Sequence, residues 1–573
     1  MKLKPQVKKI KNYLLSASLI PLVLVVACGT AAAPTSIPST PVPTTPTDAT
    51  DTPSNGQNPQ PTPASNPQPT TPPDSSISGR NDVTIVLAAE PPGLDMFLTS
   101  GSEHSTIYRE NLTDKITWVD KETKELVPLS GFSGWESVAP ERWRFFLREG
   151  VKFHNGEEWN AAAAKVSVDI QGDPNRGTDS FNDTGHIVGE VVDNLTLDIV
   201  CDSACPIFPG VAKALGFQAP KWYTENPEEV TIRNTMGFGP YRLVSWDPGL
   251  SIQLEAHPDY LPNPESAESR APVLQNVTYL FREESAVRSA MVQAGEADLA
   301  NNISLDDQDR APVFQTTASG LQLILVLDTI WHPQLSKKEV RQALAYGIDC
   351  QAIVDTILGG STTCRGIPAF PGVLGATEAN LAPYPYDPER AKQLLDEAGY
   401  DGEEIRISGR TVAYTGQQEV MEAIASYWTE LGLNVNLEFL ESGVHRTIRN
   451  CGIGNVDGDV TREPSECDHS DIYDTGVDLA SFDYSRLFYG WLSCTAPTSR
   501  VCEPNMEQLG QRAIAATGEE RRQLLEQMAN ITREDVLFLS LFDGVIFIGQ
   551  AEQLEWEARG FDRIVRVNMM NWK

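Results

Sequence analysis

The sequence carries little positive charge. Of 573 residues, 45 are Lys or Arg and 78 are Asp or Glu, so the formal net charge is -33 at pH 7. Nucleic-acid phosphates and anionic membrane surfaces would repel a chain of this sign. The composition therefore excludes nucleic acid as an expected partner, and we interpret the acidic side chains as a solvated surface.

Motifs of hydrolytic and metal chemistry are also missing. The chain has no Gly-x-Ser-x-Gly, His-Glu-x-x-His or Gly-x-x-x-x-Gly-Lys pattern, which argues against an exported hydrolase. No Cys-x-x-Cys or His-x-x-x-His pair offers a zinc site. Asn455–Asp459 resembles part of a calcium loop, but its glycine is misplaced and no closing Glu follows. We expect no enzyme activity, no metal and no cofactor.

Residues 28–80 follow a segment that is typical of a signal peptide. Five lysines precede an apolar run from Tyr13 to Ala27. Val25-Val26-Ala27-Cys28-Gly29 resembles a bacterial lipoprotein box, in which the cysteine is lipidated; an ordinary secretory site or an uncleaved anchor are the alternatives. Residues 29–80 have no aromatic side chain and 13 prolines. Such a stretch cannot bury a core, so we expect a disordered tether.

From Asp82 onward the patterns are those of an α/β protein. Leu321–Leu327 is a short apolar run that favours a strand buried on both faces. Elsewhere a helical stripe, Val420–Leu431, is followed by the alternating strand pattern Leu433–Phe439. This rhythm of helix and strand predicts a parallel or mixed sheet.

Two later apolar runs are expected to return beside Leu321–Leu327. They are Val536–Leu541 and Val545–Ile548, separated by Asp543-Gly544. We expect the two passages to form a hinge between two lobes, with Asp328–Pro333 near the ligand.

Local signals predict several element ends. Asp349 is expected to cap a helix, and Asp387-Pro388 to begin another that ends at Gly399. Val151–Phe153 is predicted as a short strand. His154 in the turn that follows has no nucleophile or second ligand nearby in sequence, so we interpret it as a structural residue.

Several motifs resemble the family 5 extracellular solute-binding proteins of ABC transporters. They include Glu90-Pro-Pro-Gly-Leu-Asp95, Leu147-Arg-Glu-Gly-Val-Lys-Phe-His-Asn-Gly156, Gly237-Phe-Gly-Pro-Tyr241 and Val340-Arg-Gln-Ala-Leu344. The second is the most specific. The chain departs from the family at Ala161–Ala164, where the family has a polar helix start.

The resemblance implies an α/β, two-lobed fold like that of periplasmic binding proteins of class II type, with an extra small domain and two hinge crossings. The implied division is a signal peptide (1–27), a lipidated Cys and tether (28–80), a discontinuous lobe I (81–125, 235–325 and 540–573), a small domain inserted in lobe I (126–234) and lobe II (326–539).

Candidate ligand residues also come from the resemblance. In dipeptide and oligopeptide binders of the family, an aspartate in a late loop pairs with the ligand's amino group; Asp478 is the closer match here and Asp483 the next, although the usual preceding tryptophan is missing. By position in similar proteins, cleft contacts are expected from Ser102, Glu103 and Tyr414. Tyr484 and Trp491 are candidate apolar walls. Solvated loops and core packing are the alternatives for these residues.

Eight cysteines other than Cys28 form an even set, which in an exported chain implies disulfides. They are Cys201, Cys205, Cys350, Cys364, Cys451, Cys467, Cys494 and Cys502. Eight cysteines allow 105 pairings, and pairing in sequence order is the simplest hypothesis.

The predicted function is that of a lipid-anchored receptor on the outer face of the cell membrane. It would close two lobes over a peptide-like or other organic solute and deliver it to the permease subunits of an ABC importer, acting as a monomer. The alternatives are an exported hydrolase and a solute-sensing receptor that has the same fold but no transporter.

Overall fold

The computed structural model describes residues 79–98, 105–120, 123, 125–176, 178, 180, 184–410, 414–452 (without the Ser442 side chain), 468–478, 482–496, 498–559 and 565–573. These residues belong to one compact unit. Ser102, Glu103, Cys28, Cys467 and Asn455–Asp459 lie outside them.

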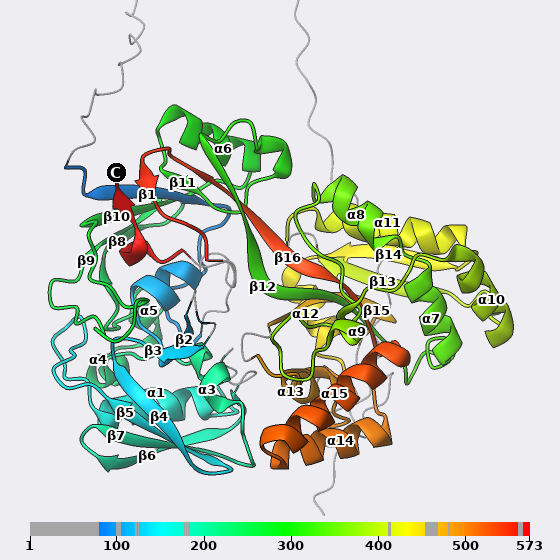
Figure 1. The fold of residues 1–573 in the computed structure, drawn as a ribbon. Helices are drawn as coiled ribbons and strands as arrows, with labels where there is room; N and C mark the ends of the chain where they lie inside the picture. Colours follow the sequence, from blue (N-terminus) through cyan, green and yellow to red (C-terminus); the bar gives the residue numbers. More distant parts are fainter. Residues whose placement is uncertain are drawn as a thin grey trace, which may run out of the picture. The chain divides into compact units, whose positions relative to one another are not determined.

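A mixed sheet of ten strands runs through the protein (Figure 1). Its order is β14 (Val435–Leu440), β13 (Ile405–Arg410), β15 (Ile472–Asp478), β12 (Val313–Leu327), β16 (Phe538–Gln550), β11 (Leu299–Ala300), β1 (Asp82–Leu87), β10 (Asn276–Phe281), β9 (Ser251–Ala256) and β8 (Tyr241–Asp247). We call the strands β14, β13 and β15 the β15 side, and β11, β1, β10, β9 and β8 the β1 side.

Strands β12 and β16 connect the two sides. β12 pairs with β15 along Leu321–Leu327, and β16 pairs with β11 through Gly549 and Gln550. β12 and β16 run antiparallel, and their register shifts between Ala318 and Gln322. The two apolar runs predicted to return beside Leu321–Leu327 are thus present, and they form one continuous strand, β16.

β12 is longer than predicted, and its apolar half is buried on both faces as expected. Leu323, Leu325 and Leu327 pack in one hydrophobic cluster, whereas Ile324 and Val326 pack in another. Since strand side chains alternate between the two faces of a sheet, the two clusters lie on opposite faces of β12. Helices cover each of these faces. Helices α7, α8, α10 and α11 contribute to the first cluster, and α9, α13, α14 and α15 to the second (Figure 1).

Smaller sheets accompany the large one. A four-stranded antiparallel sheet has the order β4 (Phe132–Ala139), β5 (Arg142–Leu147), β7 (Thr196–Cys201) and β6 (Ile187–Asp193). Helix α1 packs on it around a separate aromatic core that includes Phe145, Phe153 and Trp159. Two-stranded pairs are β2 (Thr117–Val119) with β3 (Leu126–Pro128), and β17 (Leu554–Glu555) with β18 (Asn571–Trp572).

The helices complete the fold. They are η1 (Thr106–Asn111), α1 (Ala161–Gly172), α3 (Phe208–Val211), η2 (Ala212–Ala214), α4 (Pro220–Glu225), α5 (Glu228–Thr231), α6 (Ser285–Ala294), η3 (Leu305–Asp307), α7 (Lys338–Tyr346), α8 (Cys350–Ile357), α9 (Glu378–Leu381), α10 (Pro388–Ala398), α11 (Gln417–Glu430), α12 (Ser442–Arg449), α13 (Ser485–Leu487), η5 (Phe488–Leu492), α14 (Pro504–Ala515), α15 (Gly518–Glu534) and η6 (Val567–Met569).

The predicted helix caps are confirmed. The Asp349 carboxylate accepts a hydrogen bond from the Ala352 N–H at 2.9 Å, at the start of α8. Asp387 caps α10 in the same way through the Arg390 N–H, and Gly399 ends that helix with a φ of 62°. Each cap satisfies an amide that the helix itself cannot pair. Sequence signals within a few residues were sufficient for these ends.

The strand predicted at Val151–Phe153 is wrong. Only a single bridge, between Lys152 and Glu158, occurs there. The apolar residues Val151 and Phe153 are buried in the core beneath the four-stranded sheet. Packing, rather than a strand ladder, therefore accounts for the alternating pattern.

His154 is structural, as predicted. Its Nε2 lies 3.1 Å from the Gly239 carbonyl, and its ring meets His257 edge to face at 4.9 Å. Burial, and then the neighbouring His257, lower its pKa from 6.5 to about 3. The imidazole is therefore neutral at physiological pH.

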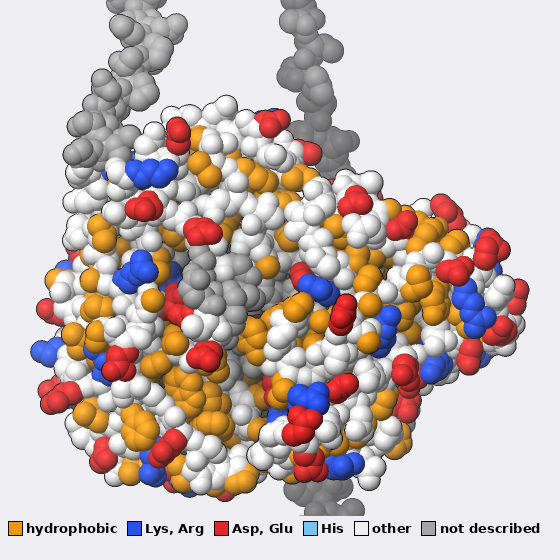
Figure 2. Space-filling view, in the orientation of Figure 1, with side chains coloured by type: hydrophobic (Ala, Val, Ile, Leu, Met, Phe, Trp, Pro, Cys, Tyr) orange, Lys and Arg blue, Asp and Glu red, His pale blue; other side chains and the backbone are white. Residues whose placement is uncertain are grey.

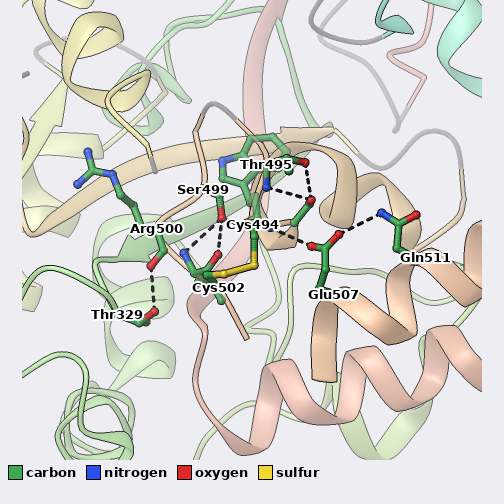
Figure 3. The surroundings of a disulfide bond; sticks show 11 residues. Thr329, Cys494, Thr495, Ser499, Arg500, Cys502, Glu507 and Gln511 are labelled. Atoms are coloured by element: carbon green, nitrogen blue, oxygen red, sulfur yellow. Dashed lines mark hydrogen bonds between the residues drawn. A yellow bond between two sulfur atoms is a disulfide. The ribbon is translucent and has the colours of Figure 1, made fainter. Parts of the chain in front are cut away.

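Three disulfides join cysteines that are neighbours in sequence order, as hypothesised. They are Cys201–Cys205, Cys350–Cys364 and Cys494–Cys502. Cys451 is also disulfide-bonded. Figure 3 shows Cys494–Cys502 closing a loop beside α14, where Glu507 accepts a hydrogen bond from the Cys494 N–H at 2.9 Å.

The Cys350–Cys364 bond should contribute more stability than Cys201–Cys205. It closes 14 residues rather than 4, and a longer closed loop removes more entropy from the unfolded chain. We expect Cys350→Ser/Cys364→Ser to lower the free energy of unfolding by about 3 kcal/mol and Cys201→Ser/Cys205→Ser by about 2 kcal/mol. Urea denaturation of both variants measures this, and a larger loss for the shorter loop would contradict it.

Candidate functional site

Two of the predicted ligand residues lie at the same edge of the sheet. Asp478 ends β15, and Tyr414 follows the end of β13. These two strands are parallel neighbours, with Ser408 opposite Tyr473. Their carboxyl ends therefore meet at one edge, which is where α/β sheets generally bind ligands.

Asp478 is paired with a lysine that lies outside the ten-stranded sheet. The Lys213 Nζ lies 2.7 Å from Asp478 Oδ2, and the two side chains are 23% and 43% exposed. Lys213 belongs to η2, which follows α3 in the core beneath the four-stranded sheet. The ion pair thus links residues that are 265 positions apart in the chain.

Two further cations lie near Lys213. Lys115 pairs with Glu110 at 2.5 Å, and the Arg109 Nη1 donates to the carbonyl of Ala214, the residue after Lys213, at 3.3 Å. Burial lowers the pKa of Lys115; Glu110 opposes this shift, whereas Lys213 and Arg109 lower the pKa further. Lys115 therefore interacts electrostatically with both Lys213 and Arg109. Figure 2 shows basic and acidic side chains interspersed over the face it presents.

Tyr414 lies above a buried polar cluster. Asp474, which is 1% exposed, accepts a hydrogen bond from Gln417 Nε2 at 2.6 Å and lies 3.1 Å from His445 Nε2. Arg410 Nη2 lies 3.4 Å from the same carboxylate. Burial and the charge of Asp474 raise the pKa of the Tyr414 hydroxyl, so it is neutral; the enclosed oxygen has no hydrogen-bond partner among the described residues.

Asp483, the second candidate aspartate, has a structural partner. It is 7% exposed, and Arg521 of α15 donates to it through Nε at 3.1 Å and Nη2 at 2.9 Å. Ser485 donates its backbone N–H and its hydroxyl to the same carboxylate. These contacts occupy the carboxylate oxygens, so the structure gives Asp478 and Asp483 different surroundings.

The two candidate aromatic walls are interior residues. Tyr484 is fully buried and Trp491 is 8% exposed, and both pack in the hydrophobic cluster against α14 and α15. These surroundings agree with core packing, which was the alternative to a role in the cleft wall for both residues.

Asp328–Pro333, which we expected near the ligand, begin at the opposite end of the paired segment from Asp478. β12 and β15 are antiparallel, with Leu321 opposite Asp478 and Leu327 opposite Ile472. Asp328 therefore leaves β12 roughly 20 Å from Asp478, at about 3.3 Å per strand residue. Its buried carboxylate accepts hydrogen bonds from the N–H groups of Ile330 and Trp331.

The described residues offer no metal site and no membrane span. They contain no group of three or more His, Cys, Asp or Glu side chains that could hold a metal ion. Within the same part of the chain, no helix combines the length and apolar character needed to cross a bilayer.

A cavity of about 490 Å³ lies elsewhere, between α1, α4 and α5, with Tyr223 and Arg176 in its lining. Its lining includes none of the candidate ligand residues.

A family profile settles the relationship that the motifs suggested. Residues 125–496 match the profile of bacterial extracellular solute-binding proteins, family 5 (middle). The chain belongs to this family. Family 5 proteins are solute-binding proteins, and none of the relatives described next is an enzyme.

Curated relatives of this family 5 protein include glutathione-binding proteins GsiB. The protein of Pectobacterium atrosepticum is 26% identical over 368 residues, which cover 62% of this chain and 64% of the relative. That of Salmonella typhi is 25% identical over 305 residues, 52% of this chain and 58% of the relative. The matches thus span less than two thirds of the length of these relatives.

Solved structures confirm the predicted two-lobed fold. Helicobacter pylori DppA, in complex with the peptide STSA, has a TM-score of 0.71 and 19% identity, covering 86% of this chain and 98% of its own. AgaA from A. tumefaciens R10, in complex with agropinic acid, has a TM-score of 0.71 and 20% identity, covering 86% and 99%. At this identity the likeness concerns the fold alone.

Replacing the two aspartates should destabilise the protein to different extents. Asp483→Ala leaves the buried Arg521 guanidinium unpaired, and breaking a buried pair costs about 3–5 kcal/mol. Asp478→Ala breaks a partly exposed pair, which contributes at most about 1 kcal/mol. Urea denaturation of the two variants measures the difference in the free energy of unfolding. An equal loss for both would show that Asp478 is also a structural residue.

Proposed function

We propose that the protein captures a peptide-like or other small organic solute at the carboxyl edge of β13 and β15 and delivers it to the permease of an ABC importer. The family match over residues 125–496 carries this proposal. The site supports it, because Asp478, Tyr414 and Arg410 place one acid, one neutral hydroxyl and one guanidinium at an edge where α/β proteins bind ligands.

The lobe division is part of the proposal. Lobe I comprises 81–125, 235–325 and 540–573 with the inserted domain 126–234, and lobe II comprises 326–539. Close to these lobe boundaries, around Gly320 and Gly544, the register of β12 and β16 shifts, and we place the hinge there. Gly320 has a φ of 74°, and a Cβ on Gly544 would lie 2.4 Å from Ser319 Oγ. Interrupted pairing at this point favours bending there.

Solute capture is tested by nondenaturing mass spectrometry of the full-length protein purified without unfolding. We expect one bound solute of a few hundred daltons, with lower occupancy in Asp478→Asn because the ligand loses a charged partner. Asp202→Asn, which changes an exposed acid (73% exposed), is the matched control and should keep full occupancy. A protein that carries no solute, and whose radius of gyration does not fall with any solute of a peptide panel, would contradict the proposal.

Anchoring through Cys28 is a further part of the proposal. The box Val25–Gly29 and the Pro/Thr-rich stretch after it support a lipidated cysteine followed by a tether. We expect mass spectrometry of the membrane fraction to find a diacylglyceryl group on Cys28 as the first residue, and Cys28→Ala to release the protein from that fraction. A mature chain that starts elsewhere would refute the anchor and leave solute binding untouched.

A further inference from the structure

Among the described residues that interact around Lys213, three are basic and two are acidic: Lys115, Lys213 and Arg109 against Glu110 and Asp478. Glu110 is paired with Lys115, which leaves Lys213 and Arg109. Among the residues that the structure describes, no carboxylate pairs with Arg109; it donates to one carbonyl, and its enclosed Nε has no hydrogen-bond partner. The acid that faces Lys213 is Asp478, at the end of β15.

An amine that binds Asp478 has to compete with Lys213. If the amine displaced the Lys213 ammonium, the lysine and Arg109 would both lack a counterion in a partly enclosed site. Uncompensated charges of this kind are unfavourable. A solute that carries a carboxylate beside its amine removes this cost, because its two charges match Asp478 on one side and Lys213 with Arg109 on the other.

We propose that Lys213 and Arg109 form an anion subsite opposite Asp478, and that the bound solute carries an amine and a neighbouring carboxylate, as an α-amino acid group does. Binding then replaces the internal Lys213–Asp478 ion pair with two ion pairs to the solute. The inference rests on the proposed function and names its class of solute. Arg109 is suited to this role, because a guanidinium can donate two parallel hydrogen bonds to a carboxylate.

Three probes test the contributions of the solute's amine and of its carboxylate separately. S-methylglutathione has an α-amino acid group and no thiol that could attack the disulfides; its diethyl ester keeps the amine and loses the carboxylates; its N-acetyl derivative keeps the carboxylates and loses the amine. We expect calorimetry with the full-length protein to show that S-methylglutathione binds at least tenfold more tightly than either derivative.

The decisive variant is Lys213→Met. It should weaken binding of S-methylglutathione at least tenfold, because the anion partner is lost. It should strengthen binding of the diethyl ester, because Lys213 no longer competes with the ester's amine for Asp478. A lysine that only supports the fold would not change the two affinities in opposite directions. Arg109→Met should weaken S-methylglutathione and leave the ester unchanged.

Lys165→Met is the matched control. Lys165 pairs with Asp169 within α1 at 2.6 Å, in the same inserted region as Lys213. Its replacement by Met should leave the affinities for all three probes unchanged. Thermal unfolding followed by circular dichroism checks that each variant is folded.

The inference is overturned if Lys213→Met shifts S-methylglutathione and its ester in the same direction or changes neither, or if the wild-type protein binds none of the three probes. It is also overturned if the solute that co-purifies lacks an amine or a carboxylate, in which case solute capture itself still stands. Absence of any captured solute instead contradicts the proposed function.

Discussion

The pairing of β12 with β16 is the interaction on which the rest of the structure depends. These two antiparallel strands join β15 to β11, and through them the two sides of the sheet. Their register determines which side chains face which core, because a shift of one residue would move every side chain to the opposite face. Leu325 and Val326 pack in different hydrophobic clusters, so both faces of β12 specify its register. Near Gly320 the pairing is interrupted, and this constraint is relaxed.

The direction of β12 also determines where the candidate site lies. Because β12 and β15 are antiparallel, Asp478 is next to Leu321 at one end of the paired segment, and Asp328 leaves at the other. The exposure of each ion pair then indicates its role. Lys213 and Asp478 are partly exposed, so their pair is weak and a ligand could replace it. Asp483 and Arg521 are buried, and their pair would be costly to break.

The sequence alone predicted features that depend on neighbouring residues. The caps at Asp349 and Asp387, the buried run Leu321–Leu327 and the disulfides between sequential cysteines all rest on patterns within some fifteen positions. Contacts between distant segments were not predictable in this way. The sequence contains no local signal that Arg521 would occupy Asp483, 38 residues away, or that Lys213 would reach Asp478. Nor could the sequence show that Asp328 and Asp478 lie at opposite ends of the paired segment, since a strand's apolar pattern is the same in both directions.

The acidic net charge does not prevent this protein from binding an anionic group. Charges separated by more than about 8 Å are largely screened at physiological ionic strength, so a net charge of -33 acts mainly on large polyanions that contact much of the surface. A small solute instead meets the side chains within a few ångströms. At η2 these include Lys213 and Arg109, and the local acid Glu110 is already paired with Lys115. The charge that excludes nucleic acid as a partner is therefore compatible with a carboxylate-bearing solute.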